Sequence, residues 1–233
     1  MNELNTIDAR FFSDVPRPMS FFIVRHGETA ANAERRIQGR SEYPLNDNGR
    51  TQAIELVDYL SEKNISCLVH SPQLRAAQTA NILCSSLGLS VPRPEPLLAE
   101  LDTGLFTGLT WNETRERFPE ESAAFSYRSW EAVPGAEKAE DLYLRAARAW
   151  KSLKETAKNS TGNLVAVSHG GTIQWLVRVT FGCRQWMPLL TTGNCGVFEL
   201  FVNPAGEGNP AYIHWRTINA LPEGALPRIP PVF

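Results

Sequence analysis

Three short apolar runs, residues 21–24, 65–69 and 164–167, stop abruptly at polar residues or glycine. Runs of this length and composition are typical of strands buried on both faces of a parallel sheet. Two later runs, 197–202 and 211–215, follow each other with little helical pattern between them. We expect these last two runs to pair as antiparallel strands.

Between these runs, apolar residues recur at the spacing of amphipathic helices. One helix is expected after Gly49 and a second after Ser71-Pro72. Ser71 is a suitable N-cap residue, Pro72 suits the first helical position, and Gly88 marks the end of this second helix. Two further helices follow later in the chain. The apolar positions of the four helices are, in order, Ala53, Leu56, Val57 and Leu60; Ala76, Ala80, Leu83 and Leu87; Leu142, Ala146, Ala149 and Leu153; and Ile173, Leu176 and Val177.

The alternation of strands and helices predicts an α/β fold. We expect a three-layer α/β/α sandwich, in which helices cover both faces of a mostly parallel sheet that has an antiparallel edge strand. No internal repeat and no convincing linker divides the chain, so a single domain over residues 1–233 is predicted. Within it, residues 1–20 form an N-terminal extension, and the proline-rich residues 221–233 form an irregular tail.

Composition limits the class of function. The chain is 42% hydrophobic and 21% charged, with a net charge of −2, which excludes a general basic face for nucleic acid but allows a local basic pocket. No stretch has the length of a membrane span, and residues 1–20 lack the apolar core of a signal peptide. Cys67, Cys84, Cys183 and Cys195 are widely spaced and suit reduced, buried thiols. We therefore expect a cytoplasmic protein with no nucleic-acid or membrane partner, either a monomer or a homodimer.

Charged residues follow each of the first three predicted strands. The first strand leads into Arg25-His26, the second into a helix that carries Arg75, and the third into His169-Gly170. Because the carboxyl ends of parallel strands meet at one edge of a sheet, these side chains should converge on one pocket. An arginine fork binds the oxygens of a phosphate dianion, and amides at a helix start add further donors. A neutral histidine in such a pocket can attack phosphorus.

A leaving oxygen also needs an acid. Glu100 and Asp102, in the loop after the second helix, are the candidates, and for Asp102 a hydrogen bond that stabilises the loop is the competing role. Of the other histidines, His70 is expected to be a bystander beside the pocket and His214 to be structural. The chain has no HExxH, HxH or clustered-carboxylate motif, so no metal site is predicted.

A series of motifs, in consistent order over about residues 21–202, resembles the histidine phosphatase superfamily, the phosphoglycerate-mutase-like proteins. An Arg-His-Gly triplet alone would be weak evidence, whereas several independent motifs in order are specific. The matching positions are residues 22–29 with Asn32; 37–40 and 44–46; Gly49 with Gln52-Ala53; Ser71-Pro72, Arg75-Ala76 and 78–80; Leu98, Glu100, Asp102, Gly104 and Gly108; and 167–171.

The resemblance implies a phosphoglycerate-mutase-like fold and a role for each matching residue. It implies that His26 is the nucleophile that becomes phosphorylated and that Glu100 is its proton donor. Arg25, Arg75 and His169 would complete the phosphate pocket. The resemblance also implies that no metal is needed, and no other cofactor is predicted for this chain. Further positions that the resemblance places at the phosphate or the substrate are Thr29, Asn32, Gln38, Gly39 and Gly170.

Hydrolysis of a small phosphorylated metabolite is the leading hypothesis for the function. A cofactor-dependent phosphoglycerate mutase is a second hypothesis, but residues 104–114 are short and lack the insertion with which such mutases grip their substrate. A catalytically silent member that binds a phosphorylated ligand is a third, and the intact nucleophile and acid count against it. Residues 134–138 resemble the family's glycine-and-acid turn only loosely, so no role is assigned to them.

Residues 91–135 are irregular, rich in proline and glycine, and predict one short helix, which the capping-box pair Thr110 and Glu113 would start. The aromatic residues around it are expected to pack mainly in the core. Long functional loops often form lids, so contact between some of these residues and the substrate stays open. They are Phe106, Trp111, Phe125, Tyr127 and Trp130.

Overall fold

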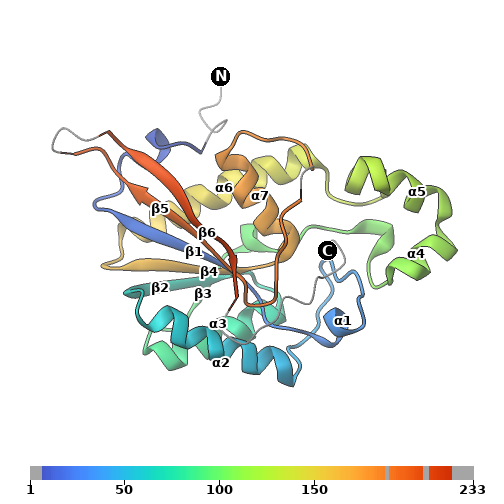
Figure 1. Cartoon of the computed structure of the whole chain (residues 1–233), viewed down its shortest axis with the longest axis horizontal. Coiled ribbons are helices and arrows are strands. Elements are labelled where there is room, and N and C mark those ends of the chain that lie inside the picture. The colour runs from blue at the N-terminus through green and yellow to red at the C-terminus, as the bar shows by residue number, and fades with distance from the viewer. Residues whose placement is uncertain (1–6, 187–188, 207–209, 222–233) are drawn as a thin grey trace.

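The computed structural model describes residues 7–186, 189–206 and 210–221. The described residues form a six-stranded sheet with the strand order β3-β2-β4-β1-β5-β6 (Figure 1). Strands β1 to β4 are parallel, β5 is antiparallel to β1, and β6 is antiparallel to β5, so the expected antiparallel pair at the end of the chain is confirmed. The strands are β1 (Met19–Arg25), β2 (Ile65–His70), β3 (Arg93–Pro94), β4 (Asn163–Ser168), β5 (Val197–Asn203) and β6 (Tyr212–Ala220).

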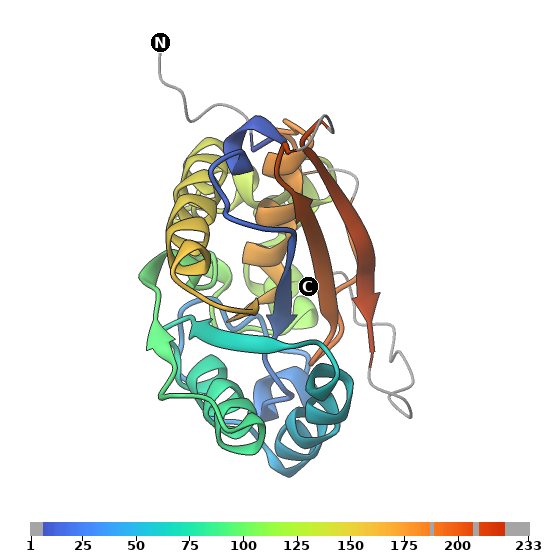
Figure 2. The same cartoon turned by 90° about the vertical axis from the view of Figure 1, so that its left-hand side faces the viewer.

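Helices cover both faces of the sheet, which confirms the three-layer α/β/α fold (Figure 1). Side chains of β1 alternate between two cores: Phe22 and Val24 pack with α2 and α3, whereas Phe21 and Ile23 pack with α6 and α7. Figure 2 shows β5 and β6 side by side along one edge of the sheet. The helices are α1 (Ala30–Ala33), α2 (Asp47–Ser61), α3 (Leu74–Leu87), α4 (Trp111–Arg117), α5 (Pro119–Arg128), α6 (Ala139–Lys158) and α7 (Gly170–Thr180).

The helix predicted after Ser71-Pro72 exists, but its predicted start is wrong. α3 begins at Leu74, after the extended residue Gln73, and Ser71 does not cap it. The Ser71 hydroxyl instead accepts from the Gln73 amide (3.3 Å) and pairs with Nε2 of His169 (2.7 Å), the residue that follows β4. Gly88 ends α3 with a φ of 65°, as predicted, since only glycine adopts this conformation at little cost.

The irregular stretch holds more helix than the sequence predicted. α4 has the predicted capping box, in which the Glu113 amide donates to Thr110 Oγ1 (3.2 Å) and the Thr110 amide to Glu113 Oε2 (2.6 Å). A second helix, α5, follows at once, so the expectation of one helix was wrong. None of the residues of α5 is fully buried, so its sequence does not show the apolar spacing that predicts a helix. Pro119 stands in its first turn, where proline is tolerated. In Figure 1, α4 and α5 project to one side of the sheet.

Parts of the two predicted terminal segments lie outside the described residues, namely 1–6 and 222–233. Residues 7–18 are irregular apart from the short 3-10 helix Arg10–Phe12, and they bury Ile7 and Phe12 against the core. Among the described residues, no helix has the length and apolar character needed to cross a membrane.

Candidate active site

The carboxyl ends of β1, β2 and β4 lie level with one another. Arg25 pairs with Ser168 and His70 with Val167 in the sheet register. Two hydrogen bonds extend this alignment beyond the strands, from the His26 amide to the Ser168 carbonyl (3.0 Å) and from the Ser71 amide to the Val167 carbonyl (2.9 Å). A pocket opens at this edge, and its lining includes Arg25, His26, Arg75, Glu100 and Gly170.

His26 is buried, and its hydrogen bonds fix the tautomer of its ring. Nδ1 donates to the carbonyl oxygen of Gly27 (2.7 Å), which can only accept. The Nε of Arg75 donates to Nε2 of His26 (3.1 Å), so Nε2 carries the lone pair of the neutral ring. The backbone at Gly27 runs so close to α2 that an added Cβ would lie 2.3 Å from the carbonyl oxygen of Gly49. A glycine is therefore required directly after the histidine.

His169 lies beside His26, with 5.1 Å between the ring centroids. Its Nε2 pairs with the Ser71 hydroxyl, whereas its buried Nδ1 has no hydrogen-bond partner among the described residues. The buried Nε of Arg25 likewise has no hydrogen-bond partner among the described residues. Each of these two groups can therefore still donate one hydrogen bond at this edge of the sheet.

Both arginines are anchored by backbone carbonyls. Arg75 donates to the carbonyl oxygens of Ser41 (2.8 Å) and Gly39 (2.9 Å), and Arg25 donates to that of Thr192. Burial lowers the pKa of both guanidinium groups, that of Arg75 to about 10, so Arg75 stays charged at neutral pH. The pocket therefore holds fixed positive charge, as binding of a phosphate dianion requires.

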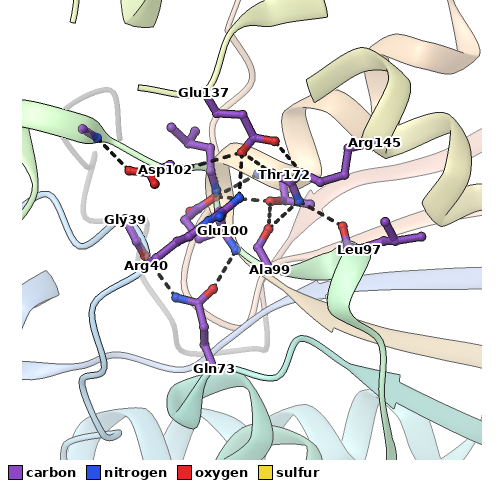
Figure 3. Close-up of polar contacts among 12 residues, drawn as sticks. Gly39, Arg40, Gln73, Leu97, Ala99, Glu100, Asp102, Glu137, Arg145 and Thr172 are labelled. Carbon is purple, nitrogen blue, oxygen red and sulfur yellow. Dashed lines mark hydrogen bonds and ion pairs between the residues drawn. The ribbon is translucent and has the colours of Figure 1, made fainter. Parts of the chain in front are cut away.

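Glu100 lies at the N-terminus of α7 (Figure 3). Its carboxylate accepts hydrogen bonds from the amides of Gly171 (3.2 Å) and Thr172 (3.0 Å), and its own amide donates to Gln73 Oε1 (2.6 Å). An added Cβ at Gly171 would lie 2.7 Å from Glu100 Oε1 and 2.2 Å from Leu101 Cδ2. Glycine at this position allows the Glu100 loop to pack directly against the helix end.

The other residues with predicted roles are only partly brought together. Asn32, Gln38 and Gly39 line the pocket with Gly170, whereas Thr29 lies outside its lining and caps α1, with its hydroxyl bonded to Asn32 and Gln38. His169 lies next to His26 but does not itself line the pocket. Of the loop aromatics, Trp130 lines the pocket; Phe106, Trp111, Phe125 and Tyr127 do not.

Three side chains that were weighed for this site lie elsewhere or act locally. Asp102 accepts a hydrogen bond from the Gly104 amide (2.9 Å). This bond stabilises the loop, which is the role that competes with that of an acid. His70 donates from Nδ1 to the Ser71 carbonyl (2.7 Å), and His214 is exposed on β6. Among the residues that the structure describes, no group of three or more His, Cys, Asp or Glu is arranged to hold a metal ion.

Sequence reasoning missed several residues that line the pocket or contact its residues. Thr192 lines it and binds Arg25 through its backbone carbonyl, and the Asn194 side chain donates to the His26 carbonyl (3.1 Å). Both lie in the irregular segment before β5, where no apolar period predicts their position. Arg36 and Ile37 also line the pocket.

The two site histidines are neutral at physiological pH. Burial, and then the positive charge of Arg75, lower the pKa of each well below 6.5. For His26 the Arg25 charge acts in the same direction, and the hydrogen bond to Gly27 opposes it. A neutral ring with its lone pair on Nε2 is the form that can attack phosphorus.

Stability is expected to fall in acid because of these histidines. An unfolded histidine takes up a proton as the pH drops below its ordinary pKa of 6.5, whereas buried His26 and His169 do so only at lower pH. Between pH 6.5 and the lowered pKa of each buried histidine, the unfolded state binds more protons than the folded state. Each histidine therefore lowers the free energy of unfolding by at most about 1.4 kcal/mol for each unit by which the pH falls. Urea unfolding at about pH 7.5 and about pH 5.5 measures this, and His26→Ala should show a weaker pH dependence than the native chain. An unchanged pH dependence in His26→Ala would contradict the expectation.

Comparison with known proteins identifies the family. The profile of the histidine phosphatase superfamily (branch 1) matches residues 21–208. The chain belongs to this superfamily. It is 35% identical over 198 residues to phosphoglycerate mutase-like protein 4 of Arabidopsis thaliana, covering 83% of this chain and 85% of the relative. It is also 35% identical over 162 residues to the metal-independent phosphoserine phosphatase of Arabidopsis thaliana, covering 68% of this chain and 67% of the relative.

Solved structures of the superfamily share the fold. The mycobacterial glucosyl-3-phosphoglycerate phosphatase complexed with VO3 superposes with a TM-score of 0.75 at 26% identity, covering 87% of this chain and 99% of that one. The superfamily match and the named phosphatases identify this chain as a phosphatase of the histidine phosphatase superfamily.

Proposed function

We propose that this phosphatase hydrolyses a small phosphate monoester through a phosphohistidine at His26, with Glu100 as general acid and base. The observation that carries the proposal is the state of His26. Its ring is buried and neutral, Nδ1 is tied to the Gly27 carbonyl, and the Nε2 lone pair faces the guanidinium of Arg75. A nucleophilic nitrogen held beside cationic groups is suited to attack a phosphate dianion.

In the first step, the Nε2 lone pair of His26 attacks phosphorus and the bond from phosphorus to the leaving oxygen breaks. Glu100 gives its proton to that oxygen. Arg75, whose Nε donates to Nε2 in the structure, would turn to a phosphate oxygen once the substrate is bound. Arg25 and the Nδ1 of His169 would bind further oxygens. Most of the rate should come from this positioning and charge stabilisation.

In the second step, water attacks phosphorus and the bond between phosphorus and Nε2 breaks. The Glu100 carboxylate takes the proton of the attacking water, which restores the neutral histidine and the protonated acid. The phosphate leaves as product. Each group thus returns to its starting state, and the cycle needs no further reactant.

A small ester is favoured because the phosphate-binding groups share a confined pocket with Asn32, Gln38, Leu101 and Trp130. The names of the phosphoserine and glucosyl-3-phosphoglycerate phosphatases favour the same substrate class. The name of the mutase-like relative keeps isomerisation of phosphoglycerate as the competing function.

A phosphate-release screen over small phosphorylated metabolites tests the proposal, with His26→Ala as the blank. We expect phosphate release from at least one alkyl phosphate. Incubation with 3-phosphoglycerate separates the two functions: a mutase forms 2-phosphoglycerate without releasing phosphate. That result, or no turnover of any ester above the blank, would overturn the proposed hydrolysis.

A further inference from the structure

The loop that carries Glu100 is held by a buried arginine of another element. Arg145 of α6 donates from Nη1 to the carbonyl oxygens of Leu97 (3.0 Å) and Ala99 (2.7 Å), the second of which directly precedes Glu100 (Figure 3). Arg145 is only 8% exposed. Leu97 lies in the 3-10 helix Pro96–Leu98, whereas Ala99 follows it in irregular backbone. The Ala99 carbonyl is therefore fixed by side-chain donors, Arg145 and the Thr172 hydroxyl (2.6 Å).

Glu137 holds this arginine in a bidentate pair. Its Oε1 accepts from Arg145 Nε (2.7 Å) and its Oε2 from Arg145 Nη2 (3.0 Å). The two side chains are 10% and 13% exposed, so solvent screens the pair weakly. Planar pairing of this kind fixes the direction of the guanidinium as well as its charge.

The Glu137 carboxylate also binds the loop on the C-terminal side of Glu100. Glu137 Oε2 accepts from the Asp102 amide (3.4 Å) and from Arg40 Nη2 (3.3 Å), and Arg40 Nε donates to the Glu100 carbonyl (3.3 Å). Figure 3 shows Arg145 and Glu137 on one side of the Glu100 loop, with Gln73 below it. Backbone groups of residues 99, 100 and 102 are thus bound within one connected set of charges.

We infer that Arg145 and Glu137 are positioning residues that set where the Glu100 carboxyl stands relative to the leaving oxygen. The inference rests on the proposed role of Glu100 as the acid. The α7 amides hold the carboxylate itself, and Arg145 holds the backbone from which it projects. Displacing a reacting group by about 1 Å can cost about 10²-fold in rate, so an unheld loop should slow proton transfer more than binding.

Arg145→Met is the variant that tests this, with phenyl phosphate and p-nitrophenyl phosphate as probes. The two esters have similar shapes, but nitrophenolate leaves readily without a proton and phenolate leaves less readily. We expect kcat for phenyl phosphate to fall by about 10- to 100-fold with little change in KM. The first burst of nitrophenolate should keep its rate, because forming the phosphohistidine from this ester needs no acid.

A double-mutant cycle separates positioning from general support of the fold. If Arg145 acts through Glu100, adding Arg145→Met to Glu100→Gln should not slow phenyl phosphate turnover further. A further loss equal to that of the single variant would overturn the inference and leave the proposed function standing. Full activity of Glu100→Gln itself on phenyl phosphate would overturn both.

Two more variants distinguish a loss of positioning from a folding defect. Arg145→Lys keeps the charge beside Glu137 but loses the planar fork, and it should show the same selective loss on phenyl phosphate in smaller degree. Arg17→Met is the matched control, because Arg17 likewise clamps loop carbonyls, those of Ser160 (3.0 Å), Thr161 (3.2 Å) and Gly162 (2.6 Å), before β4 begins. Arg17→Met should lower stability without changing the ratio of the phenyl phosphate turnover rate to the rate of the nitrophenolate burst. The same ratio change in Arg17→Met would assign the effect to stability and contradict the inference.

Discussion

Replacement of His26 by alanine is expected to lower kcat for p-nitrophenyl phosphate by about 10⁴-fold or more, the scale seen when a covalent nucleophile is removed. The Nε2 lone pair is fixed by two hydrogen bonds and faces the cationic pocket. His169 is not expected to replace it, because its Nε2 is bound to the Ser71 hydroxyl and its ring is not part of the pocket lining. Steady-state assays with enough enzyme to detect the residual rate measure the loss.

The phosphoenzyme gives a direct second measurement. Native enzyme mixed with p-nitrophenyl phosphate and quenched in alkali should carry phosphate on a peptide that contains His26, and His26→Ala should carry none. His70→Asn is the matched control, since His70 is also a buried histidine at the same edge of the sheet but lies outside the pocket lining. Phosphate on another residue in the native enzyme, or turnover of His26→Ala close to the native rate, would contradict the assignment.

The part of the site that sequence could predict is the part that strand ends bring together. Apolar runs mark where β1 and β4 stop, and parallel register then places His26 beside His169. The family resemblance adds which of the two is the nucleophile. The structure is consistent with that choice on independent grounds, because only His26 has its Nε2 facing an arginine.

The parts that sequence could not predict depend on backbone atoms. Arg25 is anchored by the carbonyl of Thr192, and Arg145 binds the carbonyls of Leu97 and Ala99. Every residue type has a carbonyl, so such contacts leave no mark on the sequence. Ser71 shows the opposite difficulty. Its residue type suited a helix cap, but α3 starts two residues later than predicted, and the Ser71 hydroxyl pairs with His169.

Glu100→Gln is expected to lower kcat for phenyl phosphate by about 10²- to 10⁴-fold, the range that positioned acid–base catalysis supplies. Glutamine keeps the length of the side chain and one oxygen that can still accept from the Thr172 amide, and it loses only the acceptor for the Gly171 amide, so the loop should stay in place. It has no acidic proton for the leaving oxygen and no base for the attacking water. With p-nitrophenyl phosphate, the first step should survive and the second should not, which gives a burst of nitrophenolate followed by slow turnover.

Asp102→Asn is the control that separates the two acids weighed for this loop. Asp102 accepts from the Gly104 amide, and asparagine can keep that bond, so kcat for phenyl phosphate should change little. The assignment fails if Asp102→Asn shows the burst and Glu100→Gln does not. It also fails if Glu100→Gln slows both esters equally without a burst, because a lost acid and base should spare the step in which nitrophenolate leaves unaided.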